Sequence, residues 1–584
     1  MYTFSQLKKK LKNDFSGLES LRVALLGDTA TQFLVQAIRA TGYDQGFDLR
    51  LWDADFGQIE RQVFDPASAL YAFDPQIIIL FHSSQKLLSQ YNKLSSAGQE
   101  TLAQNRLTLI DELRTAIEKK TGAKIIYYNY PEIDDAVFGD YANKTGSSFL
   151  FQLRRLNYQL MEYAVTHANF HLCDLSTVQN QLGKAGLFHP SSYVNADMVL
   201  SLDALPVIAA RTLSLIGALY GRIKKCLVLD LDNTLWGGTI GDDGMENIQL
   251  GTLGIGKVFT DFQHWIKKLK ERGIILAVCS KNTGSVAKEP FISHPDMVLR
   301  LEDIAVFIAN WETKVDNIRH IGAILNIGFD SMVFLDDNPF ERAMVREAIP
   351  AITVPGLPED PAGYLEYLYT LDLFGTSSLS AEDRGRTTLY QQQAQREMGM
   401  HQFGDAEAFL KSLGMLSKVE SLNSFNMPRV AQLTQRSNQF NLRTVRYTEA
   451  DLQKIGSSPD HFIFSFTLED KFGDNGIICV VILQKETAET AFIDTWLMSC
   501  RVLQRGMENF TLNTIAGFAK QKGFRYLKGE YLPTPKNQLV KDHFANLGFS
   551  RQDDGWILDI SVFTPLETHI NGKREDTRRT ESPF

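Results

Sequence analysis

The chain has 584 residues, of which 44% are hydrophobic and 22% are charged, and its formal net charge is -9. This composition is that of a globular protein and excludes disorder over most of the chain. The mild negative charge argues against a nucleic-acid surface or an anionic-membrane anchor, so we expect small molecules or proteins as partners. Because a single hydrophobic core stops growing at about 250–300 residues, we expect three or four domains.

The segment MYTFSQLKKKLKND at the start is basic but is not followed by the apolar run of a signal peptide. No stretch reaches the roughly 18 apolar residues that a membrane-spanning helix needs. We therefore expect a cytoplasmic protein that does not associate with membranes. The cysteines are scattered and show no C-x-x-C spacing, which excludes a disulfide framework or a zinc knuckle and predicts reduced thiols. They are Cys173, Cys226, Cys279, Cys479 and Cys500.

Short apolar runs alternate with helix-like segments in the first third of the chain, which is typical of a parallel sheet built from βαβ units. The runs lie at 21–27, 76–81, 124–129 and 168–173, and the clearest helical segments at 97–120 and 149–166. We expect residues 1–210 to form one α/β domain.

A second alternating series follows, and we expect it to form a second α/β domain over residues 221–370. Its apolar runs are KKCLVLD at 224–230, GIILAVCS at 273–280 and SMVFLDD at 331–337. Residues 371–425, a polar segment after a proline- and glycine-rich one, predict a linker with a helical connection.

Beyond this linker, FIFSFTLED, GIICVVILQ and TAFIDTWLM predict antiparallel strands, and residues 506–521 predict a helix. An α+β domain is expected over 426–570. The polar segment 571–584 is expected to be a flexible tail.

Two carboxylates follow the first apolar run of the second domain, in the sequence Asp230-Leu231-Asp232-Asn233-Thr234. They lie where the chain leaves the carboxyl edge of a parallel sheet, which is where small ligands usually bind. A bare D-x-D-x-T pattern occurs by chance too often to identify the function. The identification depends on the motifs that follow it in the sequence.

Further polar residues follow the later runs in a fixed order. Ser280 ends one run and precedes Lys281 and Asn282, Lys314 lies in NWETKVDNI, and Asp336 and Asp337 end the last run. This series resembles the four motifs of the haloacid dehalogenase superfamily. The resemblance implies a Mg²⁺-dependent phosphoryl-transfer enzyme on a Rossmann-like core.

In this interpretation Asp230 is the nucleophile that forms an aspartyl phosphate, and Asp232 is the general acid and base. Asp336 and Asp337 complete a Mg²⁺ site with the Asp230 carboxylate and the Asp232 backbone carbonyl, since magnesium prefers hard oxygen ligands. Lys314 offsets the charge on the phosphorylated aspartate. The phosphoryl group and the substrate are expected to contact Ser280, Thr234, Lys281 and Asn282. The alternative is that these residues only cap turns.

The spacing of the motifs adds that the active site is open. Only 50 positions separate Asp230 from Ser280, and 34 separate Ser280 from Lys314, which is too few for a large cap domain at either point. A carrier protein or a neighbouring domain could therefore reach the site.

The longer motifs resemble the FkbH-like family. They are LDLDNTLWGGTIGDDG at 229–244, CSKN at 279–282, LDDNP at 335–339, RVAQLTQRSNQFNLRTVRYTEADL at 429–452 and MSCRVLQRGME at 498–508. The resemblance implies an enzyme that dephosphorylates a three-carbon donor, bisphosphoglycerate, and transfers the glyceryl unit to an acyl carrier protein. Such a reaction implies a cysteine that holds the acyl group, for which Cys500 is the first candidate and Cys279 the second.

The first domain resembles an SGNH-type hydrolase. The segment GDTATQ at 27–32 has Thr29 where that fold has its nucleophilic serine, and the histidine in LFHP is His189. Gly186 stands where an aspartate is expected, so we interpret this domain as a binding or docking domain. Hydrolysis by Thr29 and His189 is the alternative.

The third domain resembles the GNAT acyltransferase fold, whose glycine-rich loop binds a pyrophosphate at a helix N-terminus. The loop keeps Gly506 but has Leu503 and Glu508 at positions where other residue types are usual, and Phe544 replaces a tyrosine acid. These differences argue against acetyl transfer from acetyl-CoA, while a phosphopantetheine arm remains a possible ligand.

The segment QLTQRSNQFNLR is rich in amide side chains, and Asn438, Gln439 and Asn441 are predicted to bind substrate; turn and cap roles are equally consistent. Three functions remain open. The first is glyceryl transfer to a carrier, the second is a plain phosphatase of surface-glycan or capsule synthesis, and the third is a multidomain binding scaffold with vestigial motifs.

Overall fold

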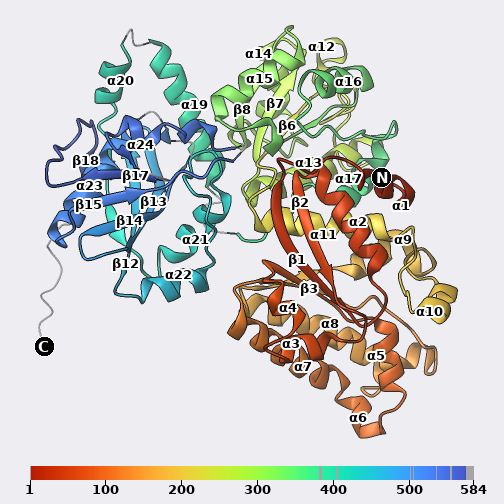
Figure 1. Ribbon diagram of the computed structural model, residues 1–584. Coiled ribbons are helices and arrows are strands. Elements are labelled where there is room, and N and C mark those ends of the chain that lie inside the picture. Colours follow the sequence, from red (N-terminus) through yellow and green to blue (C-terminus); the bar gives the residue numbers. More distant parts are fainter. Residues whose placement is uncertain are drawn as a thin grey trace, which may run out of the picture. The chain divides into compact units, whose positions relative to one another are not determined.

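The computed structural model describes residues 2–379, 385–402, 405–499, 502–503, 505–534, 536–552 and 555–573. The chain divides into two compact units, Met1–Gly217 and Ala218–Phe584. Figure 1 shows the elements of both. Among the described residues, no helix has the length and apolarity required to cross a membrane.

The first unit contains a five-stranded sheet with the order β2-β1-β3-β4-β5, in which every neighbouring pair is parallel. This order is that of a flavodoxin-like fold, in which ligands bind at the carboxyl ends of the strands. The central strands β3 and β4 are buried along their whole length, as expected for a parallel sheet covered on both faces. The strands are β1 (Glu19–Gly27), β2 (Phe47–Asp53), β3 (Ile77–Phe81), β4 (Lys124–Tyr128) and β5 (Phe170–Cys173).

The helices of this unit are α1 (Phe4–Lys10), α2 (Gln32–Asp44), α3 (Ile59–Phe64), α4 (Ala69–Ala72), α5 (Ser84–Tyr91), α6 (Ser96–Glu100), α7 (Leu102–Lys120), α8 (Phe149–Thr166), α9 (Leu175–Leu187), α10 (Pro190–Ala196) and α11 (Leu205–Leu219), with the 3-10 helix η1 (Gly139–Lys144). Helices α7 and α8 pack against each other. They are the two helices that the sequence pattern predicts most clearly.

The second unit begins with a four-stranded parallel sheet in the order β8-β7-β6-β9. Its strands are β6 (Cys226–Leu229), β7 (Ile275–Ser280), β8 (Ile304–Ala309) and β9 (Met332–Leu335). In β6 the side chains alternate between two hydrophobic clusters: Leu227 and Leu229 join one, and Cys226 and Val228 join the other. The sheet is therefore covered by apolar side chains on both faces.

The helices around this sheet are α12 (Ile240–Asp243), α13 (Gly254–Glu271), α14 (Gly284–Ser293), α15 (Lys314–Leu325), α16 (Pro339–Ala348), α17 (Tyr364–Leu371) and α19 (Arg386–Gln402), with η2 (Leu301–Asp303), η3 (Phe329–Ser331) and η4 (Pro361–Gly363). Between β6 and α13 the structure has one helix, the four-residue α12. The expected capless Rossmann-like core is confirmed.

The same unit contains a larger, mixed sheet with the order β16-β17-β15-β14-β13-β12-β10-β18, and β11 pairs with β12. Strands β12, β13 and β14 are antiparallel, whereas β14 and β15 are parallel and are connected through α23. The β14–β15 pairing covers Thr490–Ile493, although β14 continues to Met498, so the two strands part beyond that point. A parallel pair that separates within a mixed sheet matches the predicted GNAT-like, α+β class.

The strands of this sheet are β10 (Leu416–Ser417), β11 (Val419–Ser421), β12 (His461–Asp470), β13 (Gly473–Lys485), β14 (Thr490–Met498), β15 (Tyr526–Gly529), β16 (Ser550–Gln552), β17 (Gly555–Asp559) and β18 (Asn571–Gly572). The helices are α20 (Ala406–Ser412), α21 (Met427–Arg436), α22 (Glu449–Gly456), α23 (Met507–Gln521) and α24 (His543–Asn546), with η6 (Gln538–Val540). The segment expected to be a flexible tail from residue 571 contributes β18 to the sheet, and residues 574–584 lie outside the described residues.

Candidate active site

The register of the four-stranded sheet brings Asp230 and Asp336 together. Leu229 is the register partner of Leu335, and the two aspartates are the next residues of their parallel chains. The backbone N–H of Asp230 donates to the carbonyl oxygen of Leu335 at 3.0 Å, which holds the two strand ends side by side. The carboxylates therefore leave the sheet at neighbouring points of its carboxyl edge.

Lys314 lies at the start of α15 and places its ammonium group between these two carboxylates. Its Nζ is 2.8 Å from Asp230 Oδ2 and 2.5 Å from Asp336 Oδ2, and all three side chains are buried. Burial opposes a charge on Lys314, but the carboxylates of Asp230 and Asp336 outweigh it and raise the pKa of Lys314 above its ordinary value. The lysine is thus a fixed positive charge in this site.

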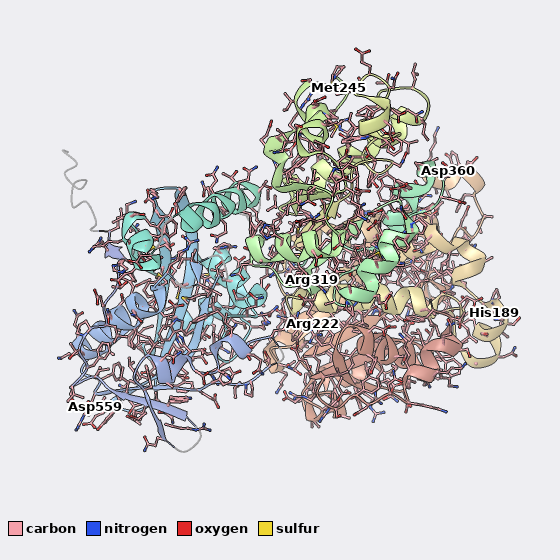
Figure 2. The ribbon with its side chains drawn as sticks, turned by 90° about the horizontal axis from the view of Figure 1, so that it is seen from above. His189, Arg222, Met245, Arg319, Asp360 and Asp559 are labelled. Carbon is pink, nitrogen blue, oxygen red and sulfur yellow. The ribbon has the colours of Figure 1, made fainter. Side chains whose placement is uncertain are left out.

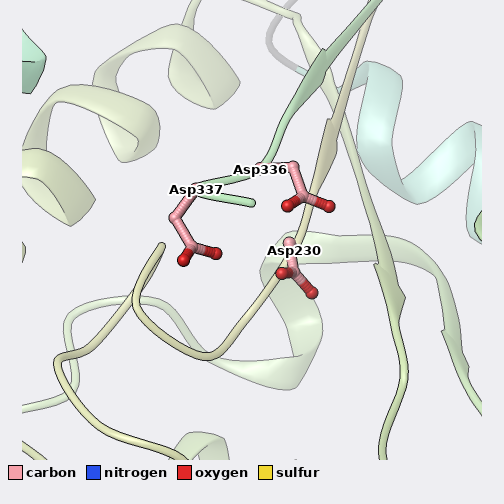
Figure 3. A group of neighbouring side chains, drawn as sticks. All are labelled: Asp230, Asp336 and Asp337. Carbon is pink, nitrogen blue, oxygen red and sulfur yellow. The ribbon is translucent and has the colours of Figure 1, made fainter. Parts of the chain in front are cut away.

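Asp337 extends the cluster, so that three carboxylates face one another (Figure 3). Each of Asp230, Asp336 and Asp337 offers an oxygen, and these oxygens lie within 4.8 Å of one another. Burial, followed by the charge of Asp230, raises the pKa of Asp336 to about 7, and the same two causes raise that of Asp337. One ammonium group does not offset three carboxylates, and the oxygen-only donor set fits a hard divalent cation such as Mg²⁺.

Asp232 lies two residues after Asp230 but has a different environment. Its Oδ1 accepts the Trp236 indole N–H at 2.9 Å and the Ile240 backbone N–H at 3.0 Å, and its Oδ2 accepts the Asn282 side-chain amide at 2.8 Å. Burial raises the pKa of Asp232 even though these three donors act in the opposite direction. Two carboxylates with such unlike surroundings are suited to different roles, one as nucleophile and one as acid or base.

A tight turn follows Asp232, and Thr234 in this turn contacts the segment that carries Asp336 and Asp337. Asn233 adopts a left-handed backbone conformation, with φ 54°, and its side-chain oxygen accepts the Gly238 backbone N–H at 3.0 Å. Thr234, expected to bind substrate, is buried, and its hydroxyl oxygen accepts the backbone N–H of Asp337 at 3.2 Å. In the structure this threonine positions the chain that carries Asp337.

The second motif lies at the end of β7. Ser280 is buried there, and Asn282 is the residue that donates to Asp232. Lys281 forms an ion pair of 2.6 Å with Glu341, which belongs to the first turn of α16. Ser280 and Asn282 thus occupy the same edge as the aspartates, while the Lys281 ammonium already has a carboxylate partner.

The sequence prediction omitted Arg342, which fixes the loop of the acidic pair. Its Nη1 donates to the carbonyl oxygen of Asp336 at 2.7 Å and to that of Asp337 at 2.6 Å. Trp236 and Glu341 were also omitted as functional residues. Trp236 stands in a motif that carries the family resemblance, which could have drawn attention to it, whereas Arg342 and Glu341 follow the aspartates on a helix and give no comparable signal.

Two cysteines were proposed to carry an acyl group, and the described residues include one of them, Cys279. Cys279 is a buried residue of the sheet core, its Sγ lies 3.7 Å from the Lys314 carbonyl oxygen, and burial raises the pKa of its thiol far above the ordinary value. These are properties of an unreactive packing residue. Cys500 lies outside the described residues.

In the first unit, Thr29 and His189 do not form a hydrogen-bonded pair. Thr29 is completely buried and its hydroxyl oxygen has no hydrogen-bond partner. The imidazole of His189, labelled in Figure 2, is exposed and caps α10 by accepting the Ser192 backbone N–H at 3.2 Å. The geometry favours a binding or structural role for this unit over hydrolysis by these two residues.

The amide side chains at the end of α21 and after it lie in two kinds of environment. Asn441 is completely buried, donates to the Ser437 carbonyl oxygen at 3.2 Å and accepts the Thr444 N–H at 2.8 Å, as a turn-forming residue does. Asn438 and Gln439 line a cavity, and Asn438 also accepts a hydrogen bond from Arg446.

The loop expected to bind a pyrophosphate is tied to the domain core. Gly506 has φ 76° and immediately precedes α23. Arg505 beside it contacts Asp470 at 3.2 Å, and Asp470 also pairs with Arg396 of α19 at 2.8 Å in a buried cluster. Phe544, in place of the tyrosine acid, is buried and leaves no room for a side chain at Gly529 of β15.

Comparisons with known proteins agree with this geometry. The family model described as "FkbH, N-terminal domain" matches residues 22–217. A solved structure of the N-terminal part of the protein BF1531 from Bacteroides fragilis, which contains a phosphatase domain complexed with Mg, is 56% identical, with a TM-score of 0.63. That match covers 65% of this chain and 100% of the other. The chain belongs to the FkbH-like family. No curated protein matches it significantly.

Two further solved structures are similar to smaller parts of this family member. The ribosomal-protein-S18-alanine N-acetyltransferase from Escherichia coli is 16% identical, with a TM-score of 0.21, and the match covers 25% of this chain and 96% of that one. The GNAT domain of S. lividans PAT is also 16% identical, with a TM-score of 0.20 and coverages of 24% and 89%.

Proposed function

We propose that the chain is a Mg²⁺-dependent phosphatase that acts on a phosphorylated small molecule through an aspartyl-phosphate mechanism. The observation that carries the proposal is the Asp230 carboxylate, which lies beside the Lys314 ammonium group and faces Asp336 and Asp337. The magnesium-bound phosphatase domain of the 56% identical relative supports the same choice of metal and reaction.

In the proposed reaction an Asp230 oxygen attacks phosphorus, and the bond from phosphorus to the leaving oxygen breaks. Asp232, whose raised pKa favours its protonated form, gives a proton to the leaving oxygen. A water molecule then attacks the aspartyl phosphate and passes a proton to Asp232, which releases phosphate and restores Asp230. A divalent cation held by Asp230, Asp336 and Asp337 would offset the repulsion between the carboxylate and the anionic phosphoryl group.

Lys314 contributes a second fixed positive charge at the place where negative charge collects. Its ammonium group is within 2.8 Å of Asp230, is held by a second carboxylate and stays protonated because both carboxylates raise its pKa. A charge that is in place before the reaction costs no reorganisation during it. Asn282, Trp236 and the Ile240 N–H hold the Asp232 carboxylate in one orientation.

The family resemblance extends the proposal to the product. The donor would be a phosphorylated three-carbon acid and the glyceryl unit would pass to an acyl carrier protein, with Cys500 as the cysteine that holds it. The capless core supports access by a large partner, because α12 is the one helix between β6 and α13. The separation of β14 from β15 provides a GNAT-like scaffold for an extended arm.

A plain phosphatase is the second candidate, and the third domain carries the observation in its favour. Arg505 in the glycine-containing loop is engaged by Asp470, and Phe544 is a buried core residue without an acidic proton. A domain with these features would determine specificity without transferring an acyl group.

The deciding experiment incubates the protein with Mg²⁺, labelled 1,3-bisphosphoglycerate and an acyl carrier protein, and follows phosphate release and protein mass. A glyceryl adduct on enzyme or carrier supports transfer, and its loss in a Cys500→Ala variant assigns the thioester. Phosphate release without an adduct leaves the plain phosphatase. Absence of phosphate release from this donor and from a panel of phosphorylated metabolites would refute both.

A further inference from the structure

In the third domain, β14 loses one of its two neighbouring strands before it ends. Strand β15 pairs with residues 490–493 of β14, whereas β13 accompanies β14 as far as Met498. The edge of β14 that faces away from β13 is therefore without β15 from Asp494 onwards. The N–H and C=O groups of such an edge pair readily with an extended chain that carries amide groups.

Residues 440–442 of the same chain lie along this edge, and we call these three residues the strap. The Leu442 N–H donates to the Trp496 carbonyl oxygen at 3.2 Å. In return, the Met498 N–H donates to the Phe440 carbonyl oxygen at 3.1 Å. The residues between these two hydrogen bonds form an antiparallel bridge. The strap thus takes the position of a strand beside the last three residues of β14.

The strap is also held on its other side, by the chain that continues from β15. The Leu532 N–H donates to the Leu442 carbonyl oxygen at 2.9 Å. The side-chain amide of Asn537 donates to the Asn441 carbonyl oxygen, also at 2.9 Å. Each strap residue is at most 4% exposed. The space between β14 and the chain after β15 therefore has the width of one extended chain, and the strap occupies it.

Arg443, directly after the strap, bridges the two strands at the point where they part. Asp494 is the first residue of β14 beyond its pairing with β15, and Glu530 directly follows β15. Arg443 Nη1 donates to Asp494 Oδ1 at 2.7 Å, and its Nε donates to Glu530 Oε2 at 2.8 Å. The three side chains are 14–32% exposed, so the ion pairs that hold the strap are accessible to water.

The backbone of Thr444, the next residue, is strained. Its φ is 58°, a conformation that β-branched residues rarely adopt. Its hydroxyl oxygen is buried and has no hydrogen-bond partner among the described residues. Backbone strain of this kind is concentrated at ligand clamps and in segments that switch between two conformations. The strap is thus well packed along β14 but is followed by a residue that disfavours the closed state.

We propose that the strap closes the third domain to an extended arm, and that such an arm binds beside β14 only when residues 440–442 leave it. The arm is the phosphopantetheine arm of an acyl carrier protein, so this inference rests on the carrier step of the proposed function. Its two amide groups pair with the edge of β14 as an added strand does. The arm and the strap therefore compete for the Met498 N–H and the Trp496 carbonyl oxygen.

Hydrogen exchange of the full chain in EDTA, followed by mass spectrometry with and without 4′-phosphopantetheine, tests this competition. Without the arm, the amides of Leu442 and Met498 should exchange slowly, because both are buried and hydrogen-bonded. Saturating phosphopantetheine should speed up exchange at Leu442 by about tenfold or more. The amide of Met498 should stay protected, because it donates to the arm instead of the strap. Binding that leaves exchange in the strap unchanged would overturn the proposal.

Two substitutions should change the affinity for phosphopantetheine in opposite directions, as measured by isothermal titration calorimetry. Arg443→Gln removes the two ion pairs that hold the strap and should bind the arm about fivefold more tightly. Thr444→Asn introduces a residue that tolerates positive φ, so it stabilises the closed strap and should bind the arm about threefold more weakly. Tighter binding in the first variant cannot result from unfolding.

Arg525→Gln is the matched control, since Arg525 of the same domain forms an ion pair of 3.3 Å with Asp559 of β17. This variant should bind phosphopantetheine like the wild type, and circular dichroism confirms that each variant is folded. Equal affinity in the wild type and Arg443→Gln, or no binding by either, would overturn the proposal. Failure of the proposed function is seen separately, as the absence of phosphate release or of a glyceryl adduct, neither of which enters the binding assay.

Discussion

Each of the two parallel sheets has an aspartate directly after one of its strands, but the side chains around the two aspartates differ. Asp28 follows β1 and donates its backbone N–H to Phe81, the last residue of β3, at 3.1 Å, just as Asp230 after β6 donates to Leu335 at the end of β9. The Asp28 carboxylate accepts the Ser83 backbone N–H, at 2.9 Å to Oδ1 and 3.0 Å to Oδ2. The Asp230 carboxylate instead contacts a buried lysine and faces two more carboxylates.

The end of a parallel strand is therefore a place where a site can form, and the side chains around it determine the chemistry of that site. Burial raises the pKa of Asp28 to about 7, and its carboxylate accepts the backbone N–H of Ser83. This aspartate is therefore suited to a structural role. At Asp230 a lysine and two further acidic groups converge, which suits nucleophilic attack assisted by a cation. Substitutions at the two positions should therefore have opposite consequences.

The largest effect is expected for Asp230→Asn. This change removes the proposed nucleophile and should lower phosphate release about a thousandfold or more. It also removes a charge that raises the pKa of Asp336, so the thermal stability of the variant without Mg²⁺ should not fall. Phosphate release and melting temperature are measured together. Asp261→Asn, an exposed aspartate of α13, is the control, and near-normal activity of Asp230→Asn would disprove the mechanism.

A smaller effect is expected for Arg342→Gln. Because Arg342 holds the backbone carbonyls of Asp336 and Asp337, its loss should raise the Mg²⁺ concentration for half-maximal activity by about tenfold, with a smaller change in kcat at saturating Mg²⁺. Arg346→Gln is a matched control on the same helix, since Arg346 donates to the Val354 carbonyl oxygen, away from the aspartates. An identical Mg²⁺ response in both variants would contradict this role.

Trp236→Phe should change activity by only a few-fold. The variant keeps most of the buried ring but removes the indole N–H that donates to Asp232. That donor lowers the pKa of Asp232, so its loss should raise the pKa and move the basic limb of the pH profile to higher pH. The measurement is kcat/KM from pH 5 to 9. A limb that stays in place would show that Asp232 is not the acid.

The smallest effect on activity is expected for Asp28→Asn, which should leave phosphate release unchanged. The raised pKa of Asp28 stabilises the folded first unit below pH 4, and this stabilisation is lost as the pH rises to about 7. The variant lacks this loss, so its melting temperature relative to the wild type should be higher at pH 8 than at pH 5. The shift of the Asp28 pKa from 3.8 to about 7 corresponds to about 2–3 kcal/mol between pH 5 and pH 8, or roughly 5–10 °C. An equal difference at both pH values would contradict it.

The sequence predicted much of the architecture from periodicity. The apolar runs of both parallel sheets and the long antiparallel strands of the third domain lie where their patterns indicate, because a buried strand must be apolar whatever surrounds it. Strands β2 and β8 were not singled out, because FDLRLWD is interrupted by charges and IAVFIA follows a short helix without a turn signal. Local patterns could not show that residues 571–572 add a strand beside β10.

For the site, the order of the residues along the chain was enough to predict a phosphoryl-transfer enzyme from Asp230, Asp232, Ser280, Lys314, Asp336 and Asp337. What each of these residues contacts follows only from the fold. Lys314 lies between two carboxylates, Asp232 accepts hydrogen bonds from three donors, and Asn441 forms a turn. Arg342 is recognised as part of the site only from its hydrogen bonds in the structure. The physical reason is that order and residue type are local properties, whereas a carboxylate's charge and an arginine's partner depend on residues that the fold brings within a few ångströms.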